Sequence, residues 1–192
     1  NIIMKDLIQK QFDEHVELAN LAAKELPELV SKAAEIIITA FKNGKRLYAC
    51  GNGGSTCDAM HLVEEIVAQY KNKRAPLPAQ HLMDPSIITC WSNDEGFEDV
   101  FRRQVEAYGR EGDILIAIST SGNSENTLRA LQQAKKQNMK TISLLGKNGG
   151  KMKGIGDLDV IVPSNTTARI QEMHILIIHS ILEAIDKEIH NV

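Results

Sequence analysis

The amino-acid sequence predicts an α/β fold, a doubly wound parallel sheet of five strands preceded by a helical hairpin. From Arg46 onward, short apolar runs alternate with longer stretches of helical periodicity, as strands and helices do when they alternate along a chain. Apart from Asp113 at its start, the run 113–118 is apolar without alternation, as expected of a strand that helices cover on both faces. Such a strand belongs inside a parallel sheet, so both observations indicate the same fold class.

The first 44 residues are predicted to form the helical hairpin. Residues 4–24 place apolar side chains along one helical stripe, and Pro27 suits the first turn of a second helix that ends at Asn43-Gly44. No strand precedes these helices, and one hairpin covers little of a sheet by itself. We therefore expect the apolar stripe to dock onto a second subunit.

Residues 45–192 hold the predicted sheet and its helices. The predicted strands are 46–50, 79–82, 113–118, 140–145 and 159–162. The predicted helices are 55–69, 97–108, 124–137 and 166–189. The polar stretch 71–78 contains two prolines and is interpreted as a surface loop. No linker, repeat or low-complexity tract divides the chain, so residues 1–192 are expected to form one domain.

The composition excludes several classes of protein. The 192 residues are 43% hydrophobic and 24% charged, which is typical of a folded globular chain. A net charge of −3 argues against nucleic acid as the main ligand. No apolar run approaches the roughly 18 residues of a membrane span, and the first ten residues do not form a signal peptide. Three cysteines without C-x-x-C spacing fit a reducing compartment, so we expect a cytoplasmic protein without a membrane partner.

Two loops carry most of the functional information. The segments 51–55 (G-N-G-G-S) and 119–124 (S-T-S-G-N-S) each follow a predicted strand and precede a predicted helix. Such loops expose backbone N–H groups at a helix N-terminus, where the helix dipole favours anions. The second loop adds the hydroxyls of Ser119, Thr120, Ser121 and Ser124. Both loops lie at the carboxyl edge of the predicted sheet and therefore predict an oxygen-rich, phosphate-bearing ligand.

Three further features allow a functional and a structural interpretation. His61 and Glu65 are four residues apart on one helical face, and they form either a metal-binding pair or a surface ion pair. The last predicted helix carries two histidines in an apolar stretch, and a packed core histidine is the usual explanation. Asn93 and Asp94 form either a turn or a polar pair directed at sugar hydroxyls.

Five motifs extend over nearly the whole chain. They are C-G-N-G-G-S-x-C-D-A-M-H-x-x-E-E at 50–65, N-D-x-G-F at 93–97, G-R-E-G-D-I-L-I-A-I-S-T-S-G-N-S at 109–124, L-G-K-x-G-G-K-M at 145–152 and R-I-Q-E-x-H-x-x-x-x-H at 169–179. The set resembles the sugar isomerase (SIS) domain family, a phosphosugar-binding module, and within it the phosphoheptose isomerases. This resemblance implies a flavodoxin-like sheet in a homotetramer. It also implies an aldose–ketose isomerase that converts sedoheptulose 7-phosphate to D-glycero-D-manno-heptose 7-phosphate through an enediol(ate), for lipopolysaccharide or other surface heptose.

The same resemblance implies a set of site residues. Glu65 and His179 are the implied acid–base pair. The implied ligands of one zinc ion per subunit are His61, Glu65, Gln171 and His179. The implied substrate contacts, besides Glu65, are Asn52, Gly53, Gly54, Asn93, Asp94, Ser119, Thr120, Ser121, Ser124 and Gln171. The chain departs from the family pattern at Ala168, where an Asp precedes R-I-Q-E in phosphoheptose isomerases, so one polar contact to the substrate is missing or is supplied elsewhere.

Two alternatives and one geometric difficulty accompany these implications. A second branch of the SIS family contains a non-catalytic protein that binds the bacterial replication initiator, but that branch lacks residues equivalent to His61, Glu65 and His179. A phosphosugar-sensing regulator would carry a DNA-binding domain, and no basic helix-turn-helix pattern precedes residue 46. In a straight helix Gln171 and His179 would be about 12 Å apart, which is wide for two ligands of one ion. An irregular helix, long side chains or a site shared between subunits would each resolve this difficulty.

Overall fold

A computed structural model describes residues 2–190 as a parallel sheet of five strands between layers of helices. The strands are β1 (Leu47–Gly51), β2 (Ala79–His81), β3 (Ile114–Ser119), β4 (Lys140–Gly146) and β5 (Leu158–Val162). All of them pair in parallel in the order β2-β1-β3-β4-β5. This is the strand order of flavodoxin-like doubly wound sheets, and it confirms the predicted fold class.

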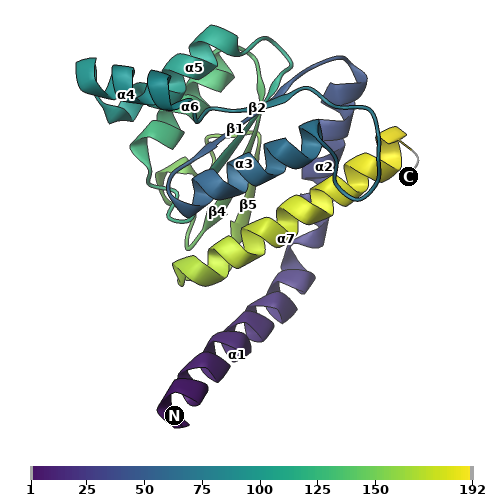
Figure 1. The fold of residues 1–192 in the computed structure, drawn as a ribbon, viewed down its shortest axis with the longest axis vertical. Helices are drawn as coiled ribbons and strands as arrows, with labels where there is room; N and C mark the ends of the chain where they lie inside the picture. The colour runs from purple at the N-terminus through teal and green to yellow at the C-terminus, as the bar shows by residue number, and fades with distance from the viewer. Residues whose placement is uncertain (1, 191–192) are drawn as a thin grey trace.

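Helices cover both faces of the sheet (Figure 1). One layer consists of α2 (Pro27–Lys42), α3 (Gly54–Val67) and α7 (Thr167–Ile185). The other consists of α4 (Pro85–Asp94), α5 (Val100–Tyr108) and α6 (Glu125–Lys136). Every residue of β1 and β3 is buried between these layers, which explains why both strands are apolar without alternation.

The N-terminal helix α1 (Ile2–Glu25) projects away from the sheet (Figure 1). Only its second half reaches the core, where Leu18 and Ala22 are buried. The rest of its apolar stripe faces solvent, with large exposed side chains at Ile3, Met4, Leu7, Ile8, Phe12, Val16 and Leu21. Two helices therefore precede β1, but the predicted hairpin is wrong: Leu26 between them is itself helical, the hydrogen bonds Leu26 N to Ala22 O and Val30 N to Leu26 O continue across it, and α2 runs on from α1 rather than folding back (Figure 1). The chain itself leaves most of the α1 stripe uncovered.

The predicted strands and helices agree with the structure to within two residues at most of their ends, and three details differ. The predicted helix 97–108 is a 3₁₀ turn, η1 (Phe97–Asp99), followed by α5. The predicted helix 166–189 is α7 followed by a π-helical turn, η3 (Asp186–His190). A further 3₁₀ turn, η2 (Gly150–Met152), lies between β4 and β5.

Helix α4 was not predicted. None of its residues is buried, so no apolar period marks it in the sequence. Its signal is local instead: Asp84 caps the helix by accepting hydrogen bonds from the amides of Ser86 and Ile87, and Pro85 occupies the first turn. The interpretation of Asn93-Asp94 as a turn is wrong, because both residues belong to the last turn of α4.

Within residues 2–190, none of the helices is long and apolar enough to cross a bilayer.

Candidate active site

The two predicted loops lie side by side at the carboxyl edge of the sheet. Gly51 at the end of β1 pairs with Ile118 of β3, so the chain leaves both strands at the same level. Gly53 then adopts φ +56° and ψ −122°, a conformation that favours glycine, and α3 begins at the next residue. The first loop therefore delivers the N-terminus of α3 directly to the edge where the second loop starts.

The loop 119–124 is organised by its own hydroxyls. Ser119 is buried, and its Oγ accepts a hydrogen bond from the Gly122 amide at 3.1 Å and lies 3.1 Å from the Ser124 Oγ. The Ser121 Oγ accepts a hydrogen bond from the Asn123 amide at 3.1 Å. Ser124 is the N-cap residue of α6, but its side chain makes no capping hydrogen bond. The helix N-terminus thus keeps donors that suit an anion.

A pair of amides joins the two loops. The Asn52 side chain donates to Asn126 Oδ1 at 2.8 Å, and the Asn126 side chain donates back to Asn52 Oδ1 at 3.0 Å. Asn126 is buried and also accepts a hydrogen bond from the Thr127 amide. The sequence interpretation missed Asn126. In the sequence it is marked only as a polar residue in the first turn of a predicted helix, two positions after the loop 119–124.

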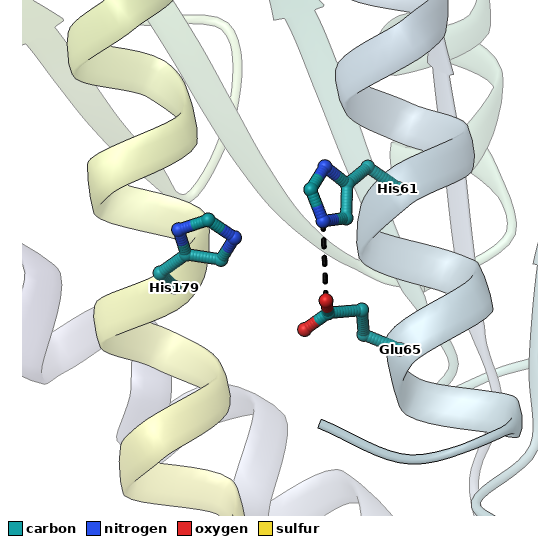
Figure 2. A group of neighbouring side chains, drawn as sticks. All are labelled: His61, Glu65 and His179. Atoms are coloured by element: carbon teal, nitrogen blue, oxygen red, sulfur yellow. Dashed lines mark hydrogen bonds and ion pairs between the residues drawn. The ribbon is translucent and has the colours of Figure 1, made fainter. Parts of the chain in front are cut away.

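Two histidines and a carboxylate face one another between α3 and α7 (Figure 2). On α3, His61 Nε2 lies 3.1 Å from Glu65 Oε1. His179 projects from α7, and its ring centroid is 5.1 Å from that of His61 at an interplanar angle of 76°. One ligand atom from each of the three residues lies within 4.8 Å of the others. The second oxygen of the carboxylate, Glu65 Oε2, is buried and has no hydrogen-bond partner.

This donor set fits a divalent ion of the zinc type. Imidazole nitrogens and a carboxylate oxygen are common zinc ligands, at about 2.0–2.2 Å from the ion. Two ligand atoms of a tetrahedral ion are then about 3.4 Å apart. His61 Nε2 and Glu65 Oε1 at 3.1 Å already suit one ion, and His179 would have to approach them by roughly an ångström. Glu65 Oε1, which faces His61, would be the carboxylate ligand of such an ion, and the buried Glu65 Oε2 has no hydrogen-bond partner. The arrangement of these three residues is therefore compatible with a bound metal ion.

Gln171 lies apart from the group His61, Glu65 and His179. Its Nε2 is only 2.2 Å from the position that a Cβ on Gly54 would occupy, so the amide packs against the start of α3. Seven residues, or about two helical turns, separate Gly54 from His61. One chain thus brings together three of the four implied metal ligands and places Gln171 beside the loop 51–55.

Asn93 and Asp94 also lie apart from the other implied site residues. Both are exposed at the end of α4, on the opposite face of the sheet from α3 and α7 (Figure 1). Asn93 Nδ2 donates to Asp94 Oδ1 at 2.8 Å. Among the described residues, neither side chain has a hydrogen bond to the loop 119–124 or to His61, Glu65 and His179.

The two histidines of α7 have different environments. His174 is fully buried, its Nε2 donates to the Leu145 carbonyl at 2.9 Å, and burial lowers its pKa to about 4. It is therefore a packed core histidine, the usual explanation for a histidine in an apolar helix. His179 is half-buried, and the Tyr70 ring stacks on it at 5.8 Å and 25°.

One carboxyl group near His61 was not singled out in the sequence. Asp58 lies one turn before His61 on α3, and its buried Oδ2 has no partner. Burial raises the pKa of Asp58 to about 6, against the opposing effect of His61. Its only signal in the sequence is the i, i+3 spacing to His61.

Comparison with known proteins identifies the family. A family model described as SIS domain matches residues 12–146. The chain is 47% identical to the phosphoheptose isomerase of Fusobacterium nucleatum over 182 residues, which make up 95% of this chain and 89% of that protein. It superposes on a phosphoheptose isomerase structure from Neisseria gonorrhoeae with a TM-score of 0.90 and 40% identity, and on one from Francisella tularensis with 0.94 and 36%. Each superposition covers 96% of this chain and 99% of the other. The chain belongs to the SIS domain family and, within it, to the phosphoheptose isomerases, which makes it an enzyme of the isomerase class.

Proposed function

We propose that this enzyme interconverts sedoheptulose 7-phosphate and D-glycero-D-manno-heptose 7-phosphate, for the synthesis of lipopolysaccharide or other surface heptose. The observation that carries the proposal is the group His61, Glu65 and His179, whose facing side chains include a buried carboxylate oxygen without a partner. Its position in a chain of the phosphoheptose isomerase family supports the choice of a seven-carbon phosphosugar.

The reaction moves the carbonyl group from C2 of the ketose to C1 of the aldose. Glu65 removes the proton from C1 through Oε2, while its Oε1 stays oriented by His61 at 3.1 Å. The electron pair of the C1–H bond forms the C1=C2 bond of an enediol(ate). Glu65 then returns a proton to C2, and His179 exchanges protons at O1 and O2 so that one oxygen becomes the new carbonyl.

The substrate phosphate is assigned to the loop 119–124. The uncapped N-terminus of α6 and the hydroxyls of Ser121 and Ser124 supply donors for a dianion. Asn52, Gly53 and Gly54 face the same edge of the sheet, where they would contact the sugar hydroxyls. Asn93 and Asp94 lie at the end of α4, so they would reach a sugar only by a movement of α4 or from another subunit.

We also propose that His61, Glu65 and His179 hold one zinc-type ion per subunit. Such an ion would supply Lewis-acid polarisation of the substrate carbonyl. Gln171 would join them only after its side chain leaves Gly54, or from a neighbouring subunit. Elemental analysis of protein purified without chelator should find about one divalent ion per chain, and His61→Ala should lose it. An occupancy of one ion that persists in a His61→Ala/His179→Ala protein would place the metal elsewhere.

The assembly is proposed to be a homotetramer. The exposed stripe of α1 adjoins an apolar groove of about 680 Å³ between α1, α2 and α7, lined by residues that include Ala23, Val30, Leu176 and Ile177. A second copy of this chain would cover both surfaces, and the burial of so large an exposed patch is the usual reason for self-association. The groove borders α7, the helix that carries His179.

We place the enzyme in the cytoplasm. Cys50, Cys57 and Cys90 are all free thiols, which suits a reducing compartment.

An isomerase assay tests the proposed function. Purified protein is incubated with sedoheptulose 7-phosphate, and the aldose is followed by NMR, with fructose 6-phosphate as the matched six-carbon control. Conversion of the heptose at a kcat/KM at least tenfold above that of the hexose supports the proposal. A protein that converts neither sugar would contradict it, and tight binding of the replication initiator by that inactive protein would support the non-catalytic alternative.

A further inference from the structure

The segment after α3 crosses to α7 and to η3, the turn that follows it, and contacts them at three points. The Tyr70 ring stacks on His179, Lys71 forms an ion pair with Glu183, and Arg74 forms one with Asp186. The three partners are spaced i, i+4 and i+7, so they lie along one face at the end of α7. We call residues 70–74 the strap.

Arg74 is the most buried member of the strap. The exposed fraction of its side chain is 1%, and that of Asp186 is 5%. Arg74 Nε donates to Asp186 Oδ1 at 2.6 Å. Burying a guanidinium group costs free energy unless its N–H groups are hydrogen-bonded. The other hydrogen-bond partners of Arg74 therefore indicate which parts of the fold it holds together.

The remaining partners are backbone carbonyls, that of the neighbouring Ala75 at 3.2 Å and two at the end of α3. Arg74 Nη2 donates to the Glu65 carbonyl at 2.6 Å, and Nη1 donates to the Ile66 carbonyl at 2.9 Å. These carbonyls belong to the last turn of α3 (Gly54–Val67), where helical hydrogen bonds run out and a positive charge is favourable. One planar guanidinium therefore joins the backbone of Glu65 to the carboxylate that follows α7.

We propose that Arg74 is a positioning residue that fixes the distance between Glu65 and His179. This inference rests on the proposed function of those two residues. Glu65 and His179 come from different helices, and the described hydrogen bonds of their side chains include none between them. Arg74 links the backbone carbonyls of Glu65 and Ile66, at the end of α3, to the carboxylate of Asp186 just after α7. A shift of about 1 Å between reacting groups can cost roughly 10²-fold in rate, so this bridge bears directly on catalysis.

Paired variants separate positioning from stability. Arg74→Met leaves Asp186 buried without its partner and should lower the Tm strongly. Arg74→Met/Asp186→Leu replaces the buried ion pair by apolar side chains, a change that is often neutral for stability. We expect the double variant to recover most of the Tm while kcat stays at least tenfold below wild type, with KM within about twofold because the phosphate loop is unchanged. Arg74→Lys keeps the charge but not the planar fork, and it should give an intermediate kcat.

A matched control and a crystallographic measurement complete the test. Val105→Ala opens the core beneath α5, on the other face of the sheet, and should lower the Tm with kcat within about twofold of wild type. In crystals of the double variant, the 5.1 Å separation of the His61 and His179 rings should change by about 1 Å or more. Recovery of kcat together with Tm in the double variant, or an equal loss of kcat in Val105→Ala, would reduce Arg74 to a structural residue. If wild-type protein does not isomerise the sugar, the proposed function fails and the crystals alone decide, an unchanged ring separation overturning the inference.

Discussion

Replacing Glu65 by Gln removes one proton acceptor and changes little else. The Gln side chain has the same length, and its Oε1 can still accept a hydrogen bond from His61 Nε2 across the 3.1 Å that the carboxylate spans. What is lost is the basicity of the second oxygen, which is buried and free of partners. The substitution therefore isolates the proposed step, removal of the C1 proton.

The expected loss follows from what a positioned base contributes. General-base catalysis supplies about 10²- to 10⁴-fold in rate, or roughly 2.7–5.4 kcal/mol of activation free energy. The exposed fraction of the Glu65 side chain is 16%, so water has little access to take over the proton transfer. We expect kcat for Glu65→Gln to fall at least about 10²-fold. KM should stay within a few-fold of the wild-type value, because the substitution leaves the phosphate loop 119–124 unchanged.

The assay compares two adjacent glutamates. Initial rates of aldose formation are measured by NMR over a range of sedoheptulose 7-phosphate concentrations for wild type, Glu65→Gln and Glu64→Gln. Glu64 is exposed and lies on a different face of α3, so its variant should keep the wild-type kcat. Thermal unfolding of all three proteins checks that the fold is intact. A kcat for Glu65→Gln within tenfold of wild type would refute the assignment of Glu65 as the base.

Three further predictions concern the phosphate loop, the assembly and the pH dependence of stability. Ser124→Ala should raise KM more than it lowers kcat in steady-state kinetics, because a distant phosphate is held equally in ground and transition states; an unchanged KM would move the phosphate elsewhere. Phe12→Glu should turn a tetramer into smaller species in light scattering, whereas Glu17→Lys, a charge change on the same helix, should not; a wild-type monomer would refute the assembly. Burial lowers the pKa of His174 to about 4, so the unfolded chain binds a proton that the folded chain excludes as the pH falls below about 6.5. The free energy of unfolding should drop between pH 7 and pH 5 by about 2 kcal/mol more in wild type than in His174→Gln, and equal drops in urea titrations would contradict this origin.

The sequence predicts most of this fold because the sheet is buried on both faces. Strands such as β1 and β3 must then be apolar throughout, and the helices that cover them must be amphipathic, so both leave a periodic signal. Helix α4 shows the limit of that signal. Its residues are at most half-buried, and only the capping residue Asp84 and the first-turn Pro85 mark it in the sequence.

The candidate site is predictable only where it is local. His61 and Glu65 share one helix, so their spacing alone places them face to face. His179 joins them from a helix more than a hundred residues later, and family motifs rather than periodicity point to it. Arg74 leaves no such signal: in the sequence it belongs to a polar loop between a predicted helix and a predicted strand. Its role depends on a fold that brings the end of α3 beside the end of α7, which pairwise spacing cannot reveal.

The measurement that tests the central claim most directly is deuterium incorporation during turnover. Wild-type enzyme and Glu65→Gln are incubated with sedoheptulose 7-phosphate in D₂O, and the sugars are examined by NMR and mass spectrometry. If Glu65 carries the proton through an enediol(ate), wild type should form the aldose with deuterium at C2 and return ketose with deuterium at C1. In Glu65→Gln, aldose formation and deuterium incorporation into the ketose should both be at least about 10²-fold slower. Deuterium incorporation or aldose formation at the wild-type rate in Glu65→Gln would contradict the account.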